Sequence, residues 1–272
     1  MSRYFLSFDI EDWFHAHNMK PMVDRSDWET AEQRVSVNTR RILDLLDNHE
    51  IKATFFILGW VADRYPDLVE EIDSRGHEVA SHGYNHKLLY EQSQSDVRSD
   101  IERSLDVLEP LVSQSIRGYR APSFSITDWA VDILSDLGFK YDSSSFPFDT
   151  HDRYGRLTHP EDSTETIATL NENMTEVQLP LLDLPGISLP WAGGGYFRVM
   201  PYPVYQRGLK RIARSRDVVF YLHPWDLDPD QPQFDELPLS YRLRHYTNLD
   251  RTADRLNRLL EQFDWQPIGS AV

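Results

Sequence analysis

Short apolar runs alternate with amphipathic helical segments along most of this chain, and this alternation limits the possible folds more than any other feature. Predicted strands lie at residues 4–8, 52–58, 77–81, 116–119, 139–141 and 218–222. Helical spacing of apolar residues predicts helices at 36–46, 60–75, 95–111, 127–137, 203–214 and 248–263. Ser36 is the predicted cap of the first helix, and the second is expected to be interrupted near Pro66. Strands connected through helices pair in parallel, so the sequence predicts an α/β fold built on a parallel sheet.

The 272 residues are interpreted as a single domain, residues 1–272, because no internal repeat, low-complexity run or linker divides them. The alternation fades in a polar excursion at about 143–176, to which we assign no chemistry. Strand character returns at 177–184 and 187–189.

The composition excludes several kinds of partner and chemistry. A formal net charge of −16 argues against nucleic acid and against an anionic membrane, which both require basic surfaces. The absence of cysteine excludes disulfides, thiolate metal sites and a cysteine nucleophile. No apolar run approaches the ~20 residues that span a bilayer, and the first residues do not resemble an export signal. We therefore expect a cytoplasmic protein without membrane insertion.

Polar residues follow the ends of several predicted strands. In parallel α/β sheets, functional side chains gather at the carboxyl ends of the strands. Three carboxylates directly after a buried strand are costly unless a positive group meets them. The residues in these positions are Asp9, Glu11, Asp12, His82, His86, Arg120, Asp142 and His223.

His82 and His86 follow the predicted strand 77–81 and are four positions apart. If the chain is helical there, both imidazoles lie on one face. Two converging imidazoles suit a divalent transition metal, most often zinc. A pair of solvated loop histidines has the same spacing, so the spacing alone leaves both interpretations open.

Three consecutive glycines, Gly193 to Gly195, permit positive φ angles and close backbone approach. They favour a β-bulge or tight turn and a ligand contact about equally. Their spacing does not match a nucleotide-binding glycine motif.

Taken together, these passages resemble polysaccharide deacetylases of carbohydrate esterase family 4, the NodB-homology type. His82 and His86 match the family's His-x-x-x-His motif, Arg120 and Pro122 its Arg-x-Pro motif, and Leu222 and His223 its Leu-His motif. The passages 7–15, 193–198 and 220–226 are similar to the branch found with exopolysaccharide and exosortase-type loci. The resemblance covers nearly the whole chain and implies a distorted (β/α) barrel with fewer than eight strands.

The resemblance also implies an activity, the metal-dependent hydrolysis of an N-acetyl group on an amino sugar. It makes Asp9 the base, Arg120 its orienting partner and His223 the acid that protonates the leaving amine. His82 and His86 become ligands of a divalent metal, zinc first, with cobalt and nickel as alternatives. The family's first motif has two adjacent aspartates, whereas Ile10 follows Asp9 here, so either Glu11 or Asp12 is the carboxylate ligand.

The remaining expectations concern the substrate, an N-acetylated sugar. The Ser123 backbone N–H is expected to contact the oxyanion, although many family members carry an aromatic residue at this position. Trp191, Tyr196 and Trp225 offer apolar faces to a sugar ring or to the core, and Arg198 is predicted to bind substrate. His15 and His17 are interpreted as bystanders. The alternative functions are a cyclic amide or ureide hydrolase of the allantoinase or imidase type, and a non-catalytic sugar-binding protein.

Overall fold

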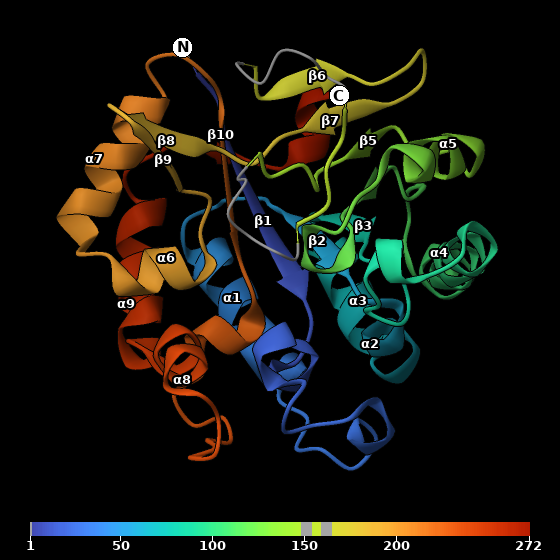
Figure 1. Cartoon of the computed structure of the whole chain (residues 1–272), viewed down its shortest axis with the longest axis horizontal. Coiled ribbons are helices and arrows are strands. Elements are labelled where there is room, and N and C mark those ends of the chain that lie inside the picture. Colours follow the sequence, from blue (N-terminus) through green and yellow to red (C-terminus); the bar gives the residue numbers. More distant parts are fainter. Residues whose placement is uncertain (1, 148–153, 159–164) are drawn as a thin grey trace.

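The computed structural model describes residues 2–147, 154–158 and 165–272 (Figure 1). A nine-stranded sheet within these residues has the order β10-β1-β2-β3-β4-β5-β7-β6, and β11 also pairs with β1. Its strands are β1 (Tyr4–Ile10), β2 (Thr54–Ile57), β3 (Glu78–Ser81), β4 (Gly118–Tyr119), β5 (Tyr141–Asp142), β6 (Ile167–Thr169), β7 (Thr175–Val177), β10 (Val218–Leu222) and β11 (Trp265–Gln266). A separate hairpin comprises β8 (Leu181–Leu184) and β9 (Ile187–Pro190).

Parallel pairing runs without interruption from β10 to β7, and β6 is added antiparallel at the edge. The predicted distorted (β/α) barrel is therefore confirmed, since the described part of the sheet has seven neighbouring parallel strands along this path. β10 pairs with β1 from Tyr4↔Val218 to Phe8↔Leu222, so the two halves of the chain share one sheet. The segment 143–176 is not featureless, because it contains β6 and most of β7.

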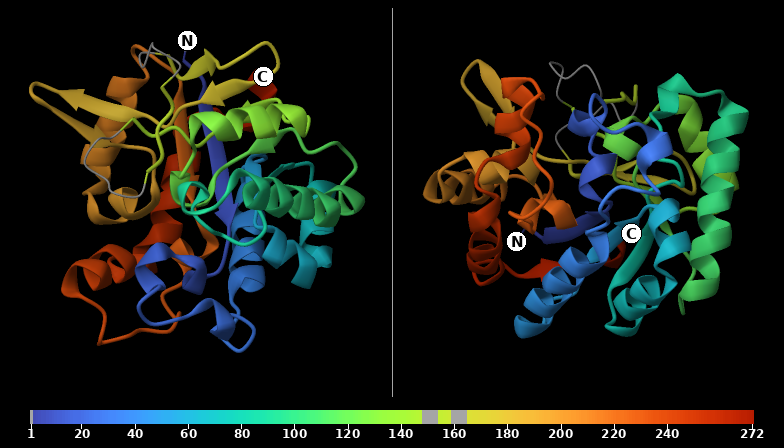
Figure 2. Two further views of the ribbon diagram at one scale, coloured as in Figure 1. Left: turned by 45° about the vertical axis from the view of Figure 1, so that its right-hand side comes forward. Right: turned by 90° about the horizontal axis from the view of Figure 1, so that it is seen from below.

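Helices flank the sheet on both sides of β1 (Figures 1 and 2). On one side are α2 (Gly59–Arg64), α3 (Pro66–Ser74), α4 (Gln94–Leu108) and α5 (Asp128–Asp136). On the other are α6 (Gly194–Val199), α7 (Tyr202–Ile212), α8 (Leu239–Tyr246) and α9 (Leu249–Leu260). None of the helices in the described residues is both long and apolar enough to cross a membrane.

Local sequence explains most helix boundaries. Pro66 occupies the first position of α3, where its missing N–H costs nothing, and this confirms the predicted interruption. α1 (Val35–Asn48) begins after Arg34, so the predicted cap at Ser36 is wrong by two positions. The glycine run is predicted to form a bulge or tight turn or to contact a ligand, and in the structure Gly194 and Gly195 begin the short helix α6.

Trp191 belongs to the core, which corrects its prediction as a sugar-binding face. Only 1% of its surface is exposed, and its ring stacks on Tyr205 at 5.3 Å between centroids. Its indole N–H donates to the Tyr205 carbonyl at 2.9 Å. Both the ring face and the polar atom are therefore satisfied inside the protein.

Candidate active site

The site begins at the carboxyl end of β1, where Asp9 and Glu11 alternate with Ile10. Residues two apart on an extended chain point to the same side, so both carboxylates face one pocket. They are 2% and 3% exposed. Two buried carboxylates require positive or hydrogen-bonding partners, and His82, His86, Arg120 and His223 supply them.

Asp12 does not join this group. Its carboxylate accepts three backbone N–H groups, from Trp13 at 2.9 Å, Arg34 at 2.6 Å and Val35 at 2.9 Å. It thereby caps the short 3₁₀ turn Trp13–His15 and fastens it to the start of α1. Burial raises the pKa of Asp12 to about 6 despite these bonds. Asp12 is thus a structural cap, which removes it from the predicted metal ligands.

Glu11, His82 and His86 bring their ligand atoms within 4.8 Å of one another, and all three side chains are buried. Oε2 of Glu11 lies 2.7 Å from Nε2 of His86. Nδ1 of His82 donates to the Arg120 carbonyl at 2.7 Å, a contact that leaves the lone pair on Nε2 for a metal. Two imidazoles and one carboxylate are the donor set of a catalytic zinc-type site with open positions.

The electrostatics also fit a cation at this place. Burial alone raises the pKa of Glu11, but His86, His223 and His82 outweigh it and hold the pKa well below its usual range. Burial lowers the pKa of His82 to about 4, so its imidazole is neutral at neutral pH. An ionised carboxylate and a neutral imidazole are the forms that bind metal.

His86 reaches this position through a loop and not through the helix that its spacing suggested. The chain after β3 has no helical turn until the 3₁₀ segment Leu89–Glu91. His86 itself has φ 51°, a left-handed conformation that is uncommon for residues other than glycine. The two histidines therefore converge because the backbone bends, at the kind of site where such conformations concentrate.

Arg120 fixes Asp9. Its Nη1 lies 2.7 Å from Oδ1 of Asp9 and donates to the Ser7 hydroxyl at 2.9 Å. Nε and Nη2 donate to the carbonyl and hydroxyl of Ser143, each at 2.9 Å. All three guanidinium nitrogens of Arg120 donate hydrogen bonds, and the side chain is fully buried. Arg120 therefore holds Asp9 in one defined orientation. Its other oxygen, Oδ2, lies 4.0 Å from Nε2 of His223.

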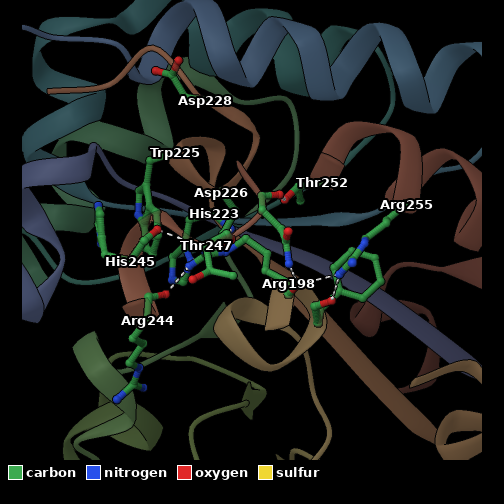
Figure 3. Close-up of polar contacts among 12 residues, drawn as sticks. Arg198, His223, Trp225, Asp226, Asp228, Arg244, His245, Thr247, Thr252 and Arg255 are labelled. Atoms are coloured by element: carbon green, nitrogen blue, oxygen red, sulfur yellow. Dashed lines mark hydrogen bonds and ion pairs between the residues drawn. The ribbon is translucent and has the colours of Figure 1, made fainter. Parts of the chain in front are cut away.

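His223 is held from behind by Asp226, which comes from the 3₁₀ turn Pro224–Leu227 (Figure 3). Nδ1 of His223 and Oδ2 of Asp226 are 2.9 Å apart, and Nε of Arg198 donates to Oδ1 of Asp226 at 2.7 Å. Burial lowers the pKa of His223, but the bond to Asp226 and the charge of Glu11 more than compensate and raise it. Sequence analysis did not assign Asp226, although a carboxylate three residues after a strand-end histidine was a usable signal.

Arg198 was predicted to bind substrate, but its donors are already engaged. Nη1 donates to the carbonyls of His245 at 2.8 Å and Thr247 at 2.9 Å, and Nη2 donates to that of Arg244 at 2.7 Å (Figure 3). The side chain borders the pocket yet is 1% exposed. Arg198 therefore positions Asp226 and the end of α8, which corrects its predicted role.

Trp225 lines the pocket, but neither face of its indole is open. His223 stacks on one face at 4.6 Å between centroids and His245 stacks at the same distance, in planes inclined by 15° and 14°. The ring therefore orients His223, and a sugar cannot stack on it. Tyr196 is half-buried and lies outside the pocket lining.

The opposite wall carries Ser123 and an aromatic group that sequence analysis missed. Phe124 meets Tyr154 and Tyr221 edge to face at 5.7 and 5.1 Å between centroids, and all three line the pocket with Ser123. Ser123 and Phe124 both have left-handed φ angles, 52° and 59°.

The two N-terminal histidines differ. His17 lines the pocket. His15 does not, because its Nδ1 accepts the Asp12 N–H at 2.8 Å and its ring packs edge-on against Trp28 and Trp60.

Asp142 lies behind the pocket and not in it. It forms a fully buried pair with Glu176. Burial raises the pKa of Asp142 although its hydrogen bond with Glu176 opposes the rise, and burial together with the charge of Asp142 raises the pKa of Glu176. The Ser144 hydroxyl donates to Asp142 at 2.6 Å and accepts the Ala121 N–H at 2.7 Å. The acid pair thus supports the segment that carries Arg120 and Ser123.

A family model described as "Polysaccharide deacetylase" matches residues 20–141 of the chain, a span that includes His82, His86 and Arg120. This part of the chain is similar to the polysaccharide deacetylase family. A second model, described as "Domain of unknown function (DUF3473)", matches residues 143–272 of the chain and includes His223 and Asp226.

Several curated proteins that are similar to this chain are named deacetylases. A peptidoglycan-N-acetylglucosamine deacetylase of Bacillus cereus is 30% identical over 39% of this chain and 44% of its own length. A chitooligosaccharide deacetylase of Sinorhizobium fredii is 35% identical over 36% of this chain and 45% of its own length. The chain thus spans less than half the length of these two relatives. The crystal structure of a putative polysaccharide deacetylase from Mycobacterium smegmatis shares the fold, with a TM-score of 0.62, 18% identity and coverage of 97% and 85% of the two chains.

Proposed function

We propose that this chain is a carbohydrate deacetylase, a metal-dependent hydrolase that removes the N-acetyl group from an amino sugar, giving acetate and a free amine. One observation carries the proposal, the convergence of three groups on one pocket. These are the ligand set Glu11, His82 and His86, the Asp9–Arg120 pair, and the His223–Asp226 pair.

Glu11, His82 and His86 would hold the metal, with zinc as the first candidate and cobalt or nickel as alternatives. When bound, such a cation polarises the acyl carbonyl and lowers the pKa of water toward neutrality. The fit rests on the donor set itself. The three ligand atoms approach one another within 4.8 Å inside a buried pocket.

Asp9 would take a proton from the attacking water. A carboxylate in contact with a guanidinium is normally a weak base. Arg120 holds Asp9 at 2.7 Å in a fixed orientation. This fixed placement compensates for the low basicity of the Asp9 carboxylate. Arg120 is in this view a positioning residue.

His223 would donate a proton to the amine as the carbon–nitrogen bond breaks. Its Nε2 faces Glu11 at 3.2 Å and Asp9 at 4.0 Å, while Asp226 fixes the other ring nitrogen. A raised pKa keeps more of the imidazole in the acid form. Across the pocket, Ser123 would offer its backbone N–H to the oxyanion.

Two finer parts of the proposal concern the domain organisation and the biological role. The single domain 1–272 is supported by the sheet that both halves share. A role in exopolysaccharide synthesis rests on the branch-like passages 7–15, 193–198 and 220–226.

The deciding experiment measures acetate released from N-acetylated sugars by the purified protein, with and without a chelator and after readdition of zinc. We expect release that the chelator abolishes and the metal restores. Hydrolysis of a cyclic amide or ureide without acetate release would favour the imidase-type alternative. Sugar binding without any turnover would favour a non-catalytic protein.

A further inference from the structure

Arg244 is a cation at the pocket that has no counter-ion within residues 2–147, 154–158 and 165–272. It lies near the end of α8, is half-buried and lines the pocket. Among the described residues its guanidinium has no hydrogen bond or ion pair, and Figure 3 shows it extending away from the Arg198 network. By contrast, Arg242 on the same helix pairs with Asp235 at 2.7 Å, and Arg255 donates to three carbonyls.

The backbone of Arg244 is fixed, although its guanidinium has no partner among the described residues. Its carbonyl accepts the Nη2 N–H of Arg198 at 2.7 Å, and Arg198 in turn is anchored on Asp226. The backbone of Arg244 is therefore tied to the group that orients His223. A held cation that faces a pocket and lacks a protein partner is typical of a ligand contact, because an unpaired and partly buried charge is otherwise costly.

A second donor lies on the same wall. Tyr221 lines the pocket, and its hydroxyl has no hydrogen-bond partner among the residues that the structure describes. Burial raises the pKa of Tyr221, the charge of Asp9 adds to that rise, and the positive charge of Arg244 opposes it. The hydroxyl is therefore protonated at neutral pH and can donate.

The glycine run leaves both donors open. A Cβ on Gly194 would lie 3.2 Å from the Tyr221 hydroxyl, and one on Gly195 would lie 3.5 Å from the Arg244 stem. Larger side chains at either position would fill the space beside these donors. Glycine is required at position 193 for a different reason, because a Cβ there would lie 1.9 Å from the Tyr221 carbonyl oxygen.

We propose that Arg244 and Tyr221 form a subsite for an oxyanion of the substrate, so that the amino sugar to be deacetylated carries a phosphate or a carboxylate. A guanidinium binds both groups through paired N–H donors, and a hydroxyl adds a third. The chain's net charge of −16 repels anions from the protein as a whole. The positive charge of Arg244 at the pocket would attract an anionic substrate at this one place. This inference rests on the proposed function and adds the class of substrate.

The test measures binding by calorimetry for three probes, N-acetylglucosamine, its 1-phosphate and N-acetylmuramic acid. We expect at least one anionic probe to bind about tenfold more tightly than the neutral sugar. Arg244→Gln should bring that ratio close to one, Arg244→Lys should restore part of it, and Tyr221→Phe should reduce it by a smaller factor. Arg242→Gln, which removes a paired cation from the same helix, should leave the ratio at the wild-type value.

The outcomes separate the sources of the anion. Preference for the 1-phosphate alone indicates a phosphate-linked sugar, and preference for N-acetylmuramic acid alone indicates a carboxylate. The subsite is overturned if the wild type prefers neither, or if Arg244→Gln weakens neutral and anionic probes equally. Acetate release is measured on the same probes. Anion preference without any release would refute the proposed function alone, whereas release without preference would refute the subsite alone.

Discussion

Asp226→Asn tests most directly whether His223 is the acid. Asp226 is fully buried and lies 2.9 Å from Nδ1 of His223. Asparagine keeps the shape but removes the negative charge, and it can present its amide NH₂ group to Nδ1. Burial lowers the pKa of His223 and Asp226 is the main group that raises it. In the variant, burial prevails and the pKa falls.

The expected loss follows from general acid catalysis, which contributes roughly 10²–10⁴-fold. We expect kcat/KM for an N-acetyl sugar to fall about 100-fold, or ~2.7 kcal/mol at 1.36 kcal/mol per factor of ten. A general acid acts only when protonated, so the rate declines as pH rises through its pKa. Because the variant lowers the pKa of His223, its decline should begin at a lower pH than in the wild type.

The assay compares acetate release from an N-acetylated chito-oligosaccharide and from an activated aryl acetate across about pH 5 to 9, the range in which histidine titrates. The ester should be affected much less, because its leaving group needs no proton. Asp228→Asn is the matched control, since Asp228 is also buried and bonded to an arginine, Arg34, but does not touch His223. Asp226→Asn breaks a buried ion pair and should lose roughly 3 kcal/mol of stability, whereas Asp228→Asn should lose less because its partner Arg34 is only partly buried. Equal losses on amide and ester, or an unmoved pH profile, would refute the acid role.

Three further changes test the rest of the site. Glu11→Gln and His82→Ala should each remove the bound metal, measured by elemental analysis, while Asp12→Asn should retain it; metal loss only in Asp12→Asn would reverse the ligand assignment. Asp9→Asn should retain metal yet lose about 100-fold or more in turnover, and a near-normal rate would exclude it as base. Glu176→Gln should flatten the pH dependence of urea unfolding. The raised pKa of Glu176 means that the folded state holds a proton which the unfolded chain loses above its ordinary pKa of 4.5, so wild-type stability falls as pH rises, by up to about 1.36 kcal/mol per pH unit. A variant with the full wild-type slope would contradict the raised pKa of Glu176.

Sequence patterning predicted the sheet and the edge on which the chemistry gathers. The apolar runs correspond to β1, β2, β3 and β10, because a short continuous apolar run is a local property of the sequence that is typical of a buried strand. Polar residues directly after these runs had to lie at the carboxyl edge, and Asp9, His82 and His223 do line one pocket there. α8 was not predicted, since its apolar residues Leu239 and Leu243 are exposed and give no core-facing pattern.

The tertiary structure decided which polar groups remain available. Glu11 and Asp12 are neighbours of the same type, yet one faces two histidines and the other is used by the N–H groups of a distant helix start. The sequence suggested Arg198 as a substrate contact, but in the structure its donors bind Asp226 and backbone carbonyls of α8. The guanidinium of Arg244 has no such partner among the described residues. The apolar run of a buried strand can be recognised within a few residues of sequence. The partner that satisfies a buried charge is contributed by another element, so it is fixed only when the chain packs.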